Sequence, residues 1–432
     1  MTIAVMKTKA ELAIAEQFAG VIGSLPGGAE VARARRGAMA VFGELGLPHR
    51  RIEEWKYTDL RVALKDPVPP PSVVDGAKLT VGDLIVALGP YMDLDAPRIV
   101  FVNGHYRRSL SNLSGAEAIS VLPLSAHFET LDEVKSDAVS ALNTAFVTDG
   151  ALIDIAADVT LAQPLLVVCL AAGRDALSST VRHKITAGAN AKATIVELFL
   201  TLQGSAIEQH MNALSEVTLG DRAQVTHVKA ASDAGRATHL SNLAVTLGTE
   251  ASYRGFALTS GQALSRNQVL ATFAGEGSKL DLSGAFLGRG SDHIDTTLTV
   301  DHAVPHCESR EFFAGVLDGR ARGIFQGKVI VRPDAQKTDG KQMARVMMLS
   351  PDAEFDSKPE LEIYADDVVC GHGSTAAQID EDLLFYCQAR GIPVAEARAL
   401  LVESFIGEAI DKVEHEGVRA ALAQTAREWL AS

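Results

Sequence analysis

Two side chains that could hold iron or accept sulfur lie close together near the C-terminus. Cys370 and His372 are two positions apart, with Gly371 between them and Gly373 following. Thiolate and imidazole are ligands suited to iron, and a thiolate can also be persulfidated. The glycines allow the backbone to turn tightly here. Because a closed metal site needs about four ligands and nothing nearby in sequence supplies the rest, the others must come from distant parts of the fold or from a partner chain.

The same two residues also fit an ordinary structural interpretation. Cys370 would then be a small buried apolar side chain, and His372 a hydrogen-bonded residue of the turn. The residue types and their spacing leave both interpretations open.

A second group of potential ligands contains His302, His306 and Cys307, with His293 upstream. His306 and Cys307 are adjacent, so on an extended strand their side chains would point to opposite faces. His302 and His306 could share a face, but Pro305 interrupts the strand between them. We therefore expect strand and turn roles in this segment, and keep His302 and Cys307 as weaker metal candidates.

Several other chemistries lack their motifs. The chain has no G-x-x-x-x-G-K-[ST] loop, so we expect no ATP hydrolysis and no bound nucleotide of its own, and Gly275-Glu276-Gly277 lacks the third glycine of a dinucleotide site. There is no G-x-S-x-G elbow. Asp366 and Asp367 are adjacent rather than facing, which makes a poor glycosidase pair.

Composition limits the partners and the compartment. The 432 residues have a net charge of −14 and no long basic run, which argues against a nucleic-acid partner. The longest apolar run, Pro164 to Gly173, is too short to span a bilayer, and the N-terminus lacks a signal-peptide pattern. We expect a cytoplasmic protein with no membrane partner. Reduced thiols are expected, because the cysteines are too few and too scattered for a disulfide framework.

The elements that must position these residues are mostly short strands, which follow one another from about 151 to 363 without a helix of ten residues between them. A Gly-x-x-Ala/Ser turn recurs among them. Its successive glycines are 32, 28, 27 and 13 residues apart; they are Gly188, Gly220, Gly248, Gly275 and Gly288. The first three spacings favour a coil that repeats along the chain. A parallel β-helix fits best, although an antiparallel sandwich also suits so many short strands.

Helices are expected on both sides of this core. Residues 1–66 are expected to form an N-terminal helical region. Residues 67–150 begin in a proline-rich linker and form a mixed α/β lead-in, which includes a helical piece from Leu131 to Phe146. The core occupies 151–370, and 371–432 is a C-terminal helical region with Asp380 as an N-cap. One of its helices bears a wide apolar stripe that includes Leu401 and Phe405. That stripe either packs on the end of the core or forms a docking site.

The stretch from Ala353 to Pro393 resembles the C-terminal signature of the SufB/SufD family of iron–sulfur cluster assembly proteins, and within it the SufD branch. Two further runs, E-E-W-K-Y-T at 53–58 and the segment 325–342, also match, and we assign structural roles to the latter. The matched positions of the signature are Pro359, Leu361-Glu362-Ile363, Asp367-Val368, Cys370, His372-Gly373, Thr375, Phe385-Tyr386 and Arg390-Gly391-Ile392. The branch assignment depends mainly on Cys370-Gly371-His372-Gly373, since SufB members have an H-E-A-T-like run here.

The resemblance implies a right-handed parallel β-helix flanked by helical segments. It implies a non-enzymatic scaffold subunit that pairs with a SufB-like paralogue, binds a SufC-like ABC ATPase and serves acceptor apoproteins indirectly, with a homodimer possible when the chain is alone. It makes His372, followed by Cys370, the expected site for a transient iron–sulfur cluster or iron at the SufB interface. The expected SufC-binding residues are Phe385, Tyr386, Arg390, Leu401 and Phe405. The rival interpretation is a carbohydrate-acting enzyme on a β-helix.

Overall fold

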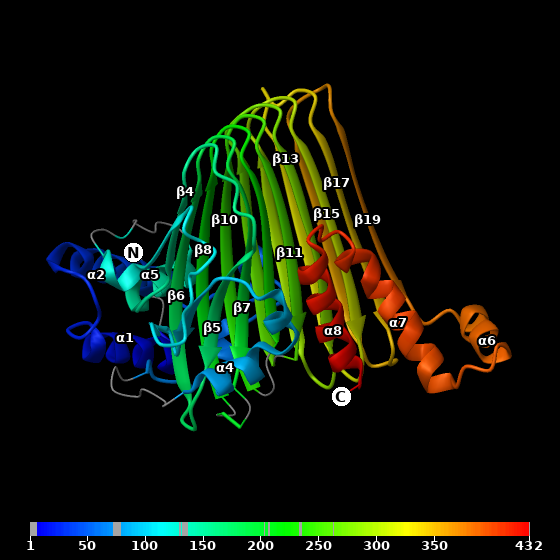
Figure 1. Ribbon diagram of the computed structural model, residues 1–432, viewed down its shortest axis with the longest axis horizontal. Helices are drawn as coiled ribbons and strands as arrows, with labels where there is room; N and C mark the ends of the chain where they lie inside the picture. Colours follow the sequence, from blue (N-terminus) through cyan, green and yellow to red (C-terminus); the bar gives the residue numbers. More distant parts are fainter. Residues whose placement is uncertain are drawn as a thin grey trace.

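The computed structural model describes residues 7–71, 79–128, 131, 137–202, 204–205, 208–232, 236–261 and 263–431. It is mainly β, with 41% strand and 26% helix, and its core is a parallel β-solenoid of about eight turns. Figure 1 shows the coils stacked side by side, with helices at both ends of the stack. The predicted parallel β-helix is therefore confirmed, and the antiparallel sandwich is wrong because neighbouring core strands pair in parallel.

Two sheets form the walls of the β-helix within the described residues, and successive core strands alternate between them. The ten-stranded sheet has the order β19 (Val369–Ala377), β17 (Asp339–Met348), β15 (Glu308–Leu317), β13 (Lys279–Gly288), β11 (Ser252–Ser260), β9 (Gln224–Ser232), β7 (Lys192–Thr201), β5 (Leu165–Ala171), β1 (Arg98–Val102) and β2 (His105–Tyr106). The nine-stranded sheet has the order β18 (Glu354–Ile363), β16 (Arg322–Val331), β14 (His293–His302), β12 (Leu264–Phe273), β10 (Arg236–Leu247), β8 (Glu208–Leu219), β6 (Leu177–Ala187), β4 (Ala151–Ile155) and β3 (Ser120–Pro123).

The recurring glycines stack at one corner of the coils. A Cβ added to Gly248 would lie 3.0 Å from the carbonyl carbon of Gly220, and one added to Gly275 would lie 2.4 Å from that of Gly248. A side chain would collide with the coil beneath, which explains why the corner repeats glycine once per coil. Gly288 is different: it ends β13 and has side chains, not a glycine backbone, as its nearest neighbours. The 13-residue spacing is therefore not a coil.

The space enclosed by the two sheets is filled mainly by apolar side chains. Alternate residues of each strand point inward, where they form one continuous cluster. Its largest fully buried members include Phe273, Phe286, Phe325 and Tyr253. We call this enclosed space the bore.

The N-terminal helical region packs on the outer face of the nine-stranded sheet, where its apolar side chains cluster with Leu240 and Leu264. Its elements are α1 (Lys9–Val21), α2 (Ala29–Leu45), η1 (Glu53–Trp55) and α3 (Leu60–Ala63), and the lead-in adds α4 (Val81–Leu88), η2 (Gly89–Leu94), η3 (Leu124–Ala126) and α5 (Ala138–Phe146). The helix expected from Leu131 begins only at Ala138, where Asp137 caps it, and 132–136 lie outside the described residues.

Trp55 anchors the N-terminal region to the core. The indole is buried, and the Arg266 guanidinium lies 3.9 Å from the ring centroid. Arg266 also forms an ion pair with Asp295 and donates to the Glu54 carbonyl (2.7 Å). The Thr58 hydroxyl donates to the same Asp295 carboxylate. The E-E-W-K-Y-T run thus docks through a buried charged pair.

Three C-terminal helices follow the last coil: α6 (Glu381–Ala389), α7 (Val394–Ile410) and α8 (Glu416–Ala431). As predicted, Asp380 is the N-cap of α6. α7 and α8 cover the outer face of the ten-stranded sheet, where their buried side chains join an apolar cluster with residues of β13 and β15. α6 projects beyond this cover (Figure 1) and buries only Leu384. No helix within the described ranges is long and apolar enough to cross a membrane.

Candidate functional site

Cys370 and His372 lie on β19, the outermost strand of the ten-stranded sheet. The tight turn predicted for this segment is wrong, because β19 pairs with β17 from Val369↔Asp339 through Ala377↔Met347. The glycines serve the strand instead. A Cβ at Gly373 would lie 2.6 Å from Met343 Cε, so glycine leaves room for this methionine on the outer face.

Both candidate residues face the bore side of the sheet. The Cys370 thiol packs against the core cluster, and a Cβ at Gly340 would lie 3.6 Å from Cys370 Sγ and 3.4 Å from Ser309 Oγ. His372 is two positions further along the strand and therefore on the same face. Since β19 belongs to the last coil, Cys370 is half-buried and His372 is exposed. The pair lies at the open end of the β-helix.

A hollow of about 470 Å³ adjoins this end. Basic, acidic and apolar residues line it together with the candidate pair: Arg310, Glu311, Phe312, Lys341, Gln342, Met343, Val369, Cys370, Gly371, His372, Gly373 and Lys412. Arg310 is held by an ion pair with Asp339 (2.6 Å). The hollow is large enough for a small inorganic group or for a side chain from another protein.

Burial raises the pKa of the Cys370 thiol, and the Asp339 and Glu311 carboxylates raise it further, against a lowering by the backbone of Gly340. The thiol form is therefore favoured, whereas the thiolate is the form that binds metal or attacks sulfur. In the chain by itself Cys370 is not an activated nucleophile.

The second group of predicted ligands is spread out. His302 lies in the bore, where burial lowers its pKa to about 4, and its ring stacks on Phe273 with centroids 4.4 Å apart. Its Nε2 is hydrogen-bonded to Ser309 Oγ (3.1 Å). Cys307 is buried, with its Sγ 3.6 Å from the Gly275 carbonyl oxygen. These contacts are the strand and turn roles that the sequence favoured.

Within the described residues, no group of three or more His, Cys, Asp and Glu side chains is placed to hold a metal ion. Cys370 and His372 are thus two possible ligands of an incomplete set, and the expectation that further ligands come from elsewhere stays a prediction. The site's position on an edge strand lets a second protein supply them.

The predicted partner-binding residues fall into two sets. Phe385 and Tyr386 on α6 are 71% and 57% exposed. Arg390 donates to the Tyr386 hydroxyl (2.8 Å) and stacks over its ring, which holds the aromatic in place. Leu401 and Phe405 on α7 are half-buried, with Phe405 packed on the apolar cluster beneath α7. The exposed apolar surface is therefore concentrated on α6.

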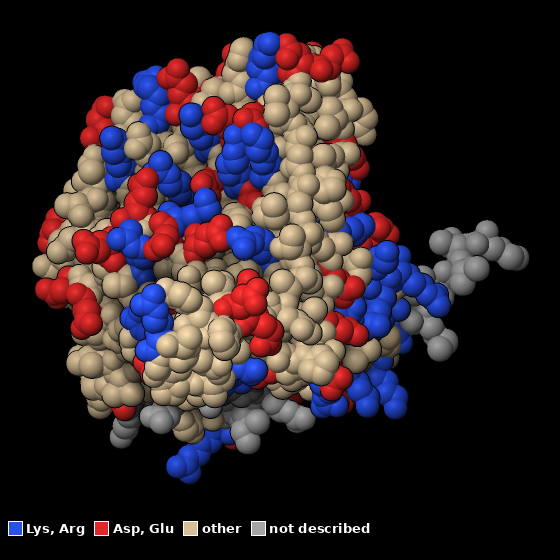
Figure 2. All heavy atoms as spheres, turned by 90° about the vertical axis from the view of Figure 1, so that its right-hand side faces the viewer, with Lys and Arg blue, Asp and Glu red and all other residues tan. Residues whose placement is uncertain are grey.

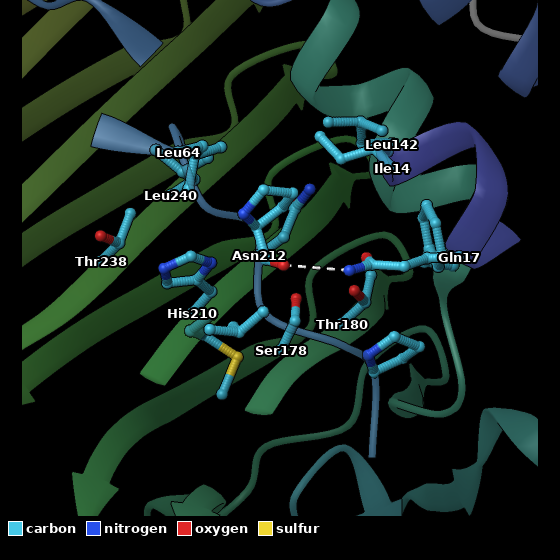
Figure 3. A pocket seen from close by; sticks show the side chains of 15 residues that line it. Ile14, Gln17, Leu64, Leu142, Ser178, Thr180, His210, Asn212, Thr238 and Leu240 are labelled. Carbon is cyan, nitrogen blue, oxygen red and sulfur yellow. Dashed lines mark hydrogen bonds between the residues drawn. The ribbon is translucent and has the colours of Figure 1, made fainter. Parts of the chain in front are cut away.

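Two other cavities are small. One, between the N-terminal region and the nine-stranded sheet, holds about 70 Å³, room for about two waters. Figure 3 shows its lining, with Gln17 donating to the Pro67 carbonyl (3.0 Å) across it; the labelled residues are Ile14, Gln17, Leu64, Leu142, Ser178, Thr180, His210, Asn212, Thr238 and Leu240. We interpret it as a gap between packed elements.

The other small cavity, of about 40 Å³, lies inside the bore. Glu197 accepts hydrogen bonds there from Ser215 (2.8 Å) and contacts His227 Nε2 (3.1 Å). His227 Nδ1 lies 2.8 Å from the Tyr253 hydroxyl, and Lys229 donates to Ser241 (2.5 Å). These polar groups pair with one another rather than facing an opening.

Two residues of the hollow were not singled out from the sequence. Glu311 and Gln342 are buried beside the candidate pair, and both face the bore. For Glu311 the signal was available: Ser309, Glu311 and Phe313 alternate along β15, so a carboxylate shares a face with a core phenylalanine. A charged residue at a core position of a strand is a candidate for function.

The charge on this end of the molecule is mixed. Figure 2 looks onto it and shows acidic and basic side chains interspersed, with uncharged surface between them. No single-sign surface of the kind that binds a phosphate backbone covers this face.

Comparison with known proteins agrees with this geometry. Residues 169–405 match the model of the SUF system FeS cluster assembly SufBD core domain. An iron-sulfur cluster assembly SufBD family protein of Synechocystis sp. is 32% identical over 409 residues, which cover 90% of this chain and 89% of that protein. The iron-sulfur cluster assembly protein SufD of Escherichia coli is 27% identical, with 87% of each chain covered. SufD of Bacillus subtilis is 29% identical over 67% of each chain.

The match spans most of the β-helix and reaches α7. Together with the full-length relatives it supports a role in iron–sulfur cluster assembly and does not favour a carbohydrate-acting enzyme. The chain belongs to the SufBD family of SUF-system iron–sulfur cluster assembly proteins, in its SufD branch.

Proposed function

We propose that this chain is a non-enzymatic scaffold subunit that pairs with a SufB-like paralogue and binds a SufC-like ABC ATPase in the cytoplasm. Together they build a nascent iron–sulfur cluster and transfer it to acceptor apoproteins. The observation that best supports this is the position of Cys370 and His372, which form an incomplete ligand pair on the free edge strand of the β-helix, next to a hollow.

The edge itself supports pairing with a similar chain. β19 and β18 are the outermost strands of their sheets, so each leaves a row of backbone donors and acceptors unpaired by another described strand. Val369, Ile363 and Tyr364 are exposed large apolar residues on or beside these strands. A paralogue with an equivalent edge would satisfy these groups and bring its own ligands to His372. In its absence two copies of this chain would pair in the same way.

The ATPase would bind at α6. Phe385 and Tyr386 are exposed aromatic side chains on a short helix that packs on little besides α7, and such residues are frequent hot spots of protein interfaces. A cluster at the Cys370–His372 end would then lie in the same part of the molecule as the ATPase, so that movement of α6 could act on the paired edges.

The test is co-expression with the cognate SufB- and SufC-like chains, purification through a tag on this chain, and measurement of subunit mass, iron and acid-labile sulfide. His372→Ala should leave the subunits in the complex and abolish cluster formation. Ser374→Ala is the matched control, because Ser374 lies two residues further along the same exposed strand.

A complex containing both partners, with cluster lost only in His372→Ala, supports the proposal. Purification of the chain with neither partner would overturn the scaffold assignment. Cluster formation by His372→Ala at the level of the native complex would overturn the placement of the site.

A further inference from the structure

Three polar side chains occupy the same level of three neighbouring strands. Glu311 on β15 pairs in register with Gln342 on β17, which pairs with His372 on β19. All three face the bore side of the sheet. The row leads from a buried carboxyl group to the exposed imidazole at the open end, with Gln342 and its strand separating the two.

Gln342 reaches across the bore. Its side chain is 3% exposed, and its Nε2 donates to the Glu360 carbonyl on the opposite sheet (3.5 Å). Its Oε1 packs on Gly327, where a Cβ would lie only 1.9 Å away. This oxygen is buried and has no hydrogen-bond partner among the described residues. Because Nε2 is held by a carbonyl, the amide cannot flip to satisfy Oε1 without placing two oxygens together.

The carboxyl group of Glu311 has the same deficit. It is 2% exposed, and both of its oxygens are buried without a hydrogen-bond partner in the described part of the chain. Burial raises its pKa to about 8, and the nearby Ser309 hydroxyl lowers it by less. Ser309 Oγ is also hydrogen-bonded to His302 Nε2, and its single O–H can supply at most one of the donors that a buried carboxylate needs.

Arg310 is the cation that favours ionisation of Glu311, but burial has the larger effect on the pKa and Arg310 is itself paired with Asp339. The titratable and charged groups on the neighbouring elements are Asp281 on β13, Arg310 on β15, Asp339 and Lys341 on β17, His302 on β14, Cys370 and His372 on β19, and Lys412 between α7 and α8. Arg310 pairs with Asp339, and Lys341 contacts the same carboxylate (3.5 Å).

Two neighbouring buried groups that are short of donors are costly, because each unsatisfied acceptor loses about 1–3 kcal/mol of hydration that nothing replaces. A single proton removes the conflict. In-register neighbours on one face have their Cβ atoms about 5 Å apart, within reach of a hydrogen bond between these two side chains. A protonated carboxyl group can donate to an amide oxygen, whereas a carboxylate can only accept.

We propose that Glu311 is held as a neutral carboxylic acid that donates to Gln342 Oε1, and that it ionises to provide a negative charge when an iron cation binds at Cys370 and His372. The proton leaves to water in the adjoining hollow, so one positive charge leaves as the cation enters. The inference depends on the proposed function for the identity of the cation. Glu311 and Gln342 are positioning residues, since neither is placed to touch the metal.

The first test is infrared difference spectroscopy of the full-length chain at neutral pH. A protonated carboxyl group absorbs above the amide band, and we expect this signal to disappear in Glu311→Gln and to shift in Gln342→Leu. The control is Gln209→Leu, which removes another buried glutamine with an unpartnered amide nitrogen on the distant β8 and should leave the signal unchanged. If Glu311→Gln has the same spectrum as the native chain, Glu311 is ionised and the proposal is overturned.

The second test adds Fe²⁺ anaerobically to the co-purified complex and follows the same band. We expect the band to be lost on addition of iron to the native complex and retained in the His372→Ala complex. Glu311→Gln, which keeps shape but cannot ionise, should bind Fe²⁺ roughly 10- to 100-fold more weakly in competition with a chelator. A band that survives iron binding, or unchanged affinity in Glu311→Gln, overturns the charge response.

The two tests separate this inference from the proposed function. The carboxyl signal is measured on the chain alone and does not require a partner. A chain that shows the neutral acid but never assembles with the paralogue would refute the scaffold proposal and leave the Glu311–Gln342 pair standing. A chain that assembles a normal cluster with its partners but shows no carboxyl signal would refute the Glu311–Gln342 pair and leave the scaffold proposal standing.

Discussion

The residues behind the site are packed as tightly as those of an ordinary core, and Gly327 shows why. Because a Cβ at this position would lie 1.9 Å from Gln342 Oε1 and 3.0 Å from Phe325 Cε1, only glycine lets the Gln342 side chain cross the bore. Gly327 belongs to the segment 325–342, for which we expected structural roles from the sequence alone. The Gln342 side chain, which reaches Gly327 across the bore, explains why glycine stands there.

Gly327→Ala should therefore destabilise the chain by about 1–3 kcal/mol, the usual cost of overpacking a core. Urea unfolding of the variant and the native chain would measure the difference. Gly371→Ala is the control, since a Cβ there meets nothing within 4 Å, and its effect should stay within about 0.5 kcal/mol. Equal stability of the two variants would contradict the packing described here.

Buried neutral histidines make the stability depend on pH. Burial lowers the pKa of His239 to about 3, and both of its ring nitrogens are buried without a hydrogen-bond partner among the described residues. The unfolded chain binds this proton near pH 6.5, and the folded chain only near pH 3. Between these values the unfolded state binds more protons, so stability is full above pH 6.5 and falls as the pH falls.

His239→Phe should reduce this acid sensitivity by about 1.4 kcal/mol per pH unit, because phenylalanine cannot take up a proton and can pack on Phe199, which is 4.6 Å from the imidazole. Urea unfolding at pH 7, 6 and 5 would give the slopes. His127→Phe, at an exposed position, should keep the native slope. An unchanged slope in His239→Phe would show that His239 does not remain neutral in the folded chain.

A functional role could be assigned to a residue from the sequence only where its partner lay in the same short segment. Cys370 and His372 were found because two ligand types stood in one short motif. The Glu311–Gln342 pair was missed because its members are 31 positions apart, and only the register of β15 and β17 places them side by side. The alternation of Ser309, Glu311 and Phe313 marked one of them, but not its neighbour.

At the scale of elements, a buried charged pair adds to the apolar contacts that attach the N-terminal region to the core. Arg266 and Asp295 are fully buried, lie on neighbouring strands of the nine-stranded sheet, and hold Trp55 and Thr58 between them and the N-terminal helices. A buried pair of this kind is costly to break, because the remaining charge has no partner.

Asp295→Ala should cost about 3–5 kcal/mol, the usual result of removing one partner from a buried ion pair, and should expose the N-terminal region to limited proteolysis. Asp301→Ala on the same strand is the control. Its partner Arg332 is 49% exposed, so breaking that pair should cost about 0–1 kcal/mol. Comparable losses in both variants would refute the role given to the buried pair.

The role of the exposed face of α6 in binding can be tested without disturbing the stability of the fold. Replacing Phe385 and Tyr386 together by alanine should change the free energy of unfolding by no more than about 0.5 kcal/mol. It should weaken binding of the SufC-like ATPase by about 2 kcal/mol or more, roughly 30-fold. Val62→Ala, another exposed apolar position but in the N-terminal region, should bind normally. Unchanged ATPase affinity in the double variant would move the docking site away from α6.

Sequence patterns predicted the coils better than their last strand. The glycine spacing indicated a repeating coil because Gly188, Gly220, Gly248 and Gly275 each contact the backbone of the coil before. The segment around Cys370 contains two glycines, Gly371 and Gly373, and was predicted as a turn. It is a strand because β17 offers it a partner of equal length, which local propensity cannot reveal.

At the scale of the molecule, the fold places everything chemically distinctive at one end. The N-terminal helices pack on the outer face of the nine-stranded sheet, and the end formed by the last coil presents two free edges, the Cys370–His372 pair, the hollow and α6 (Figure 1). The strand-rich core and its flanking helices were predictable from the sequence, whereas this concentration at one end follows only from the order of strands in the sheets.

The most direct test of the central claim is the iron and sulfide content of the complex purified through this chain, measured beside its subunit masses. We expect an iron–sulfur cluster in the native complex and in Ser374→Ala, and none in His372→Ala despite a full set of subunits. A His372→Ala complex that assembles and holds a normal cluster would contradict the claim that this end of the β-helix is where the cluster is built.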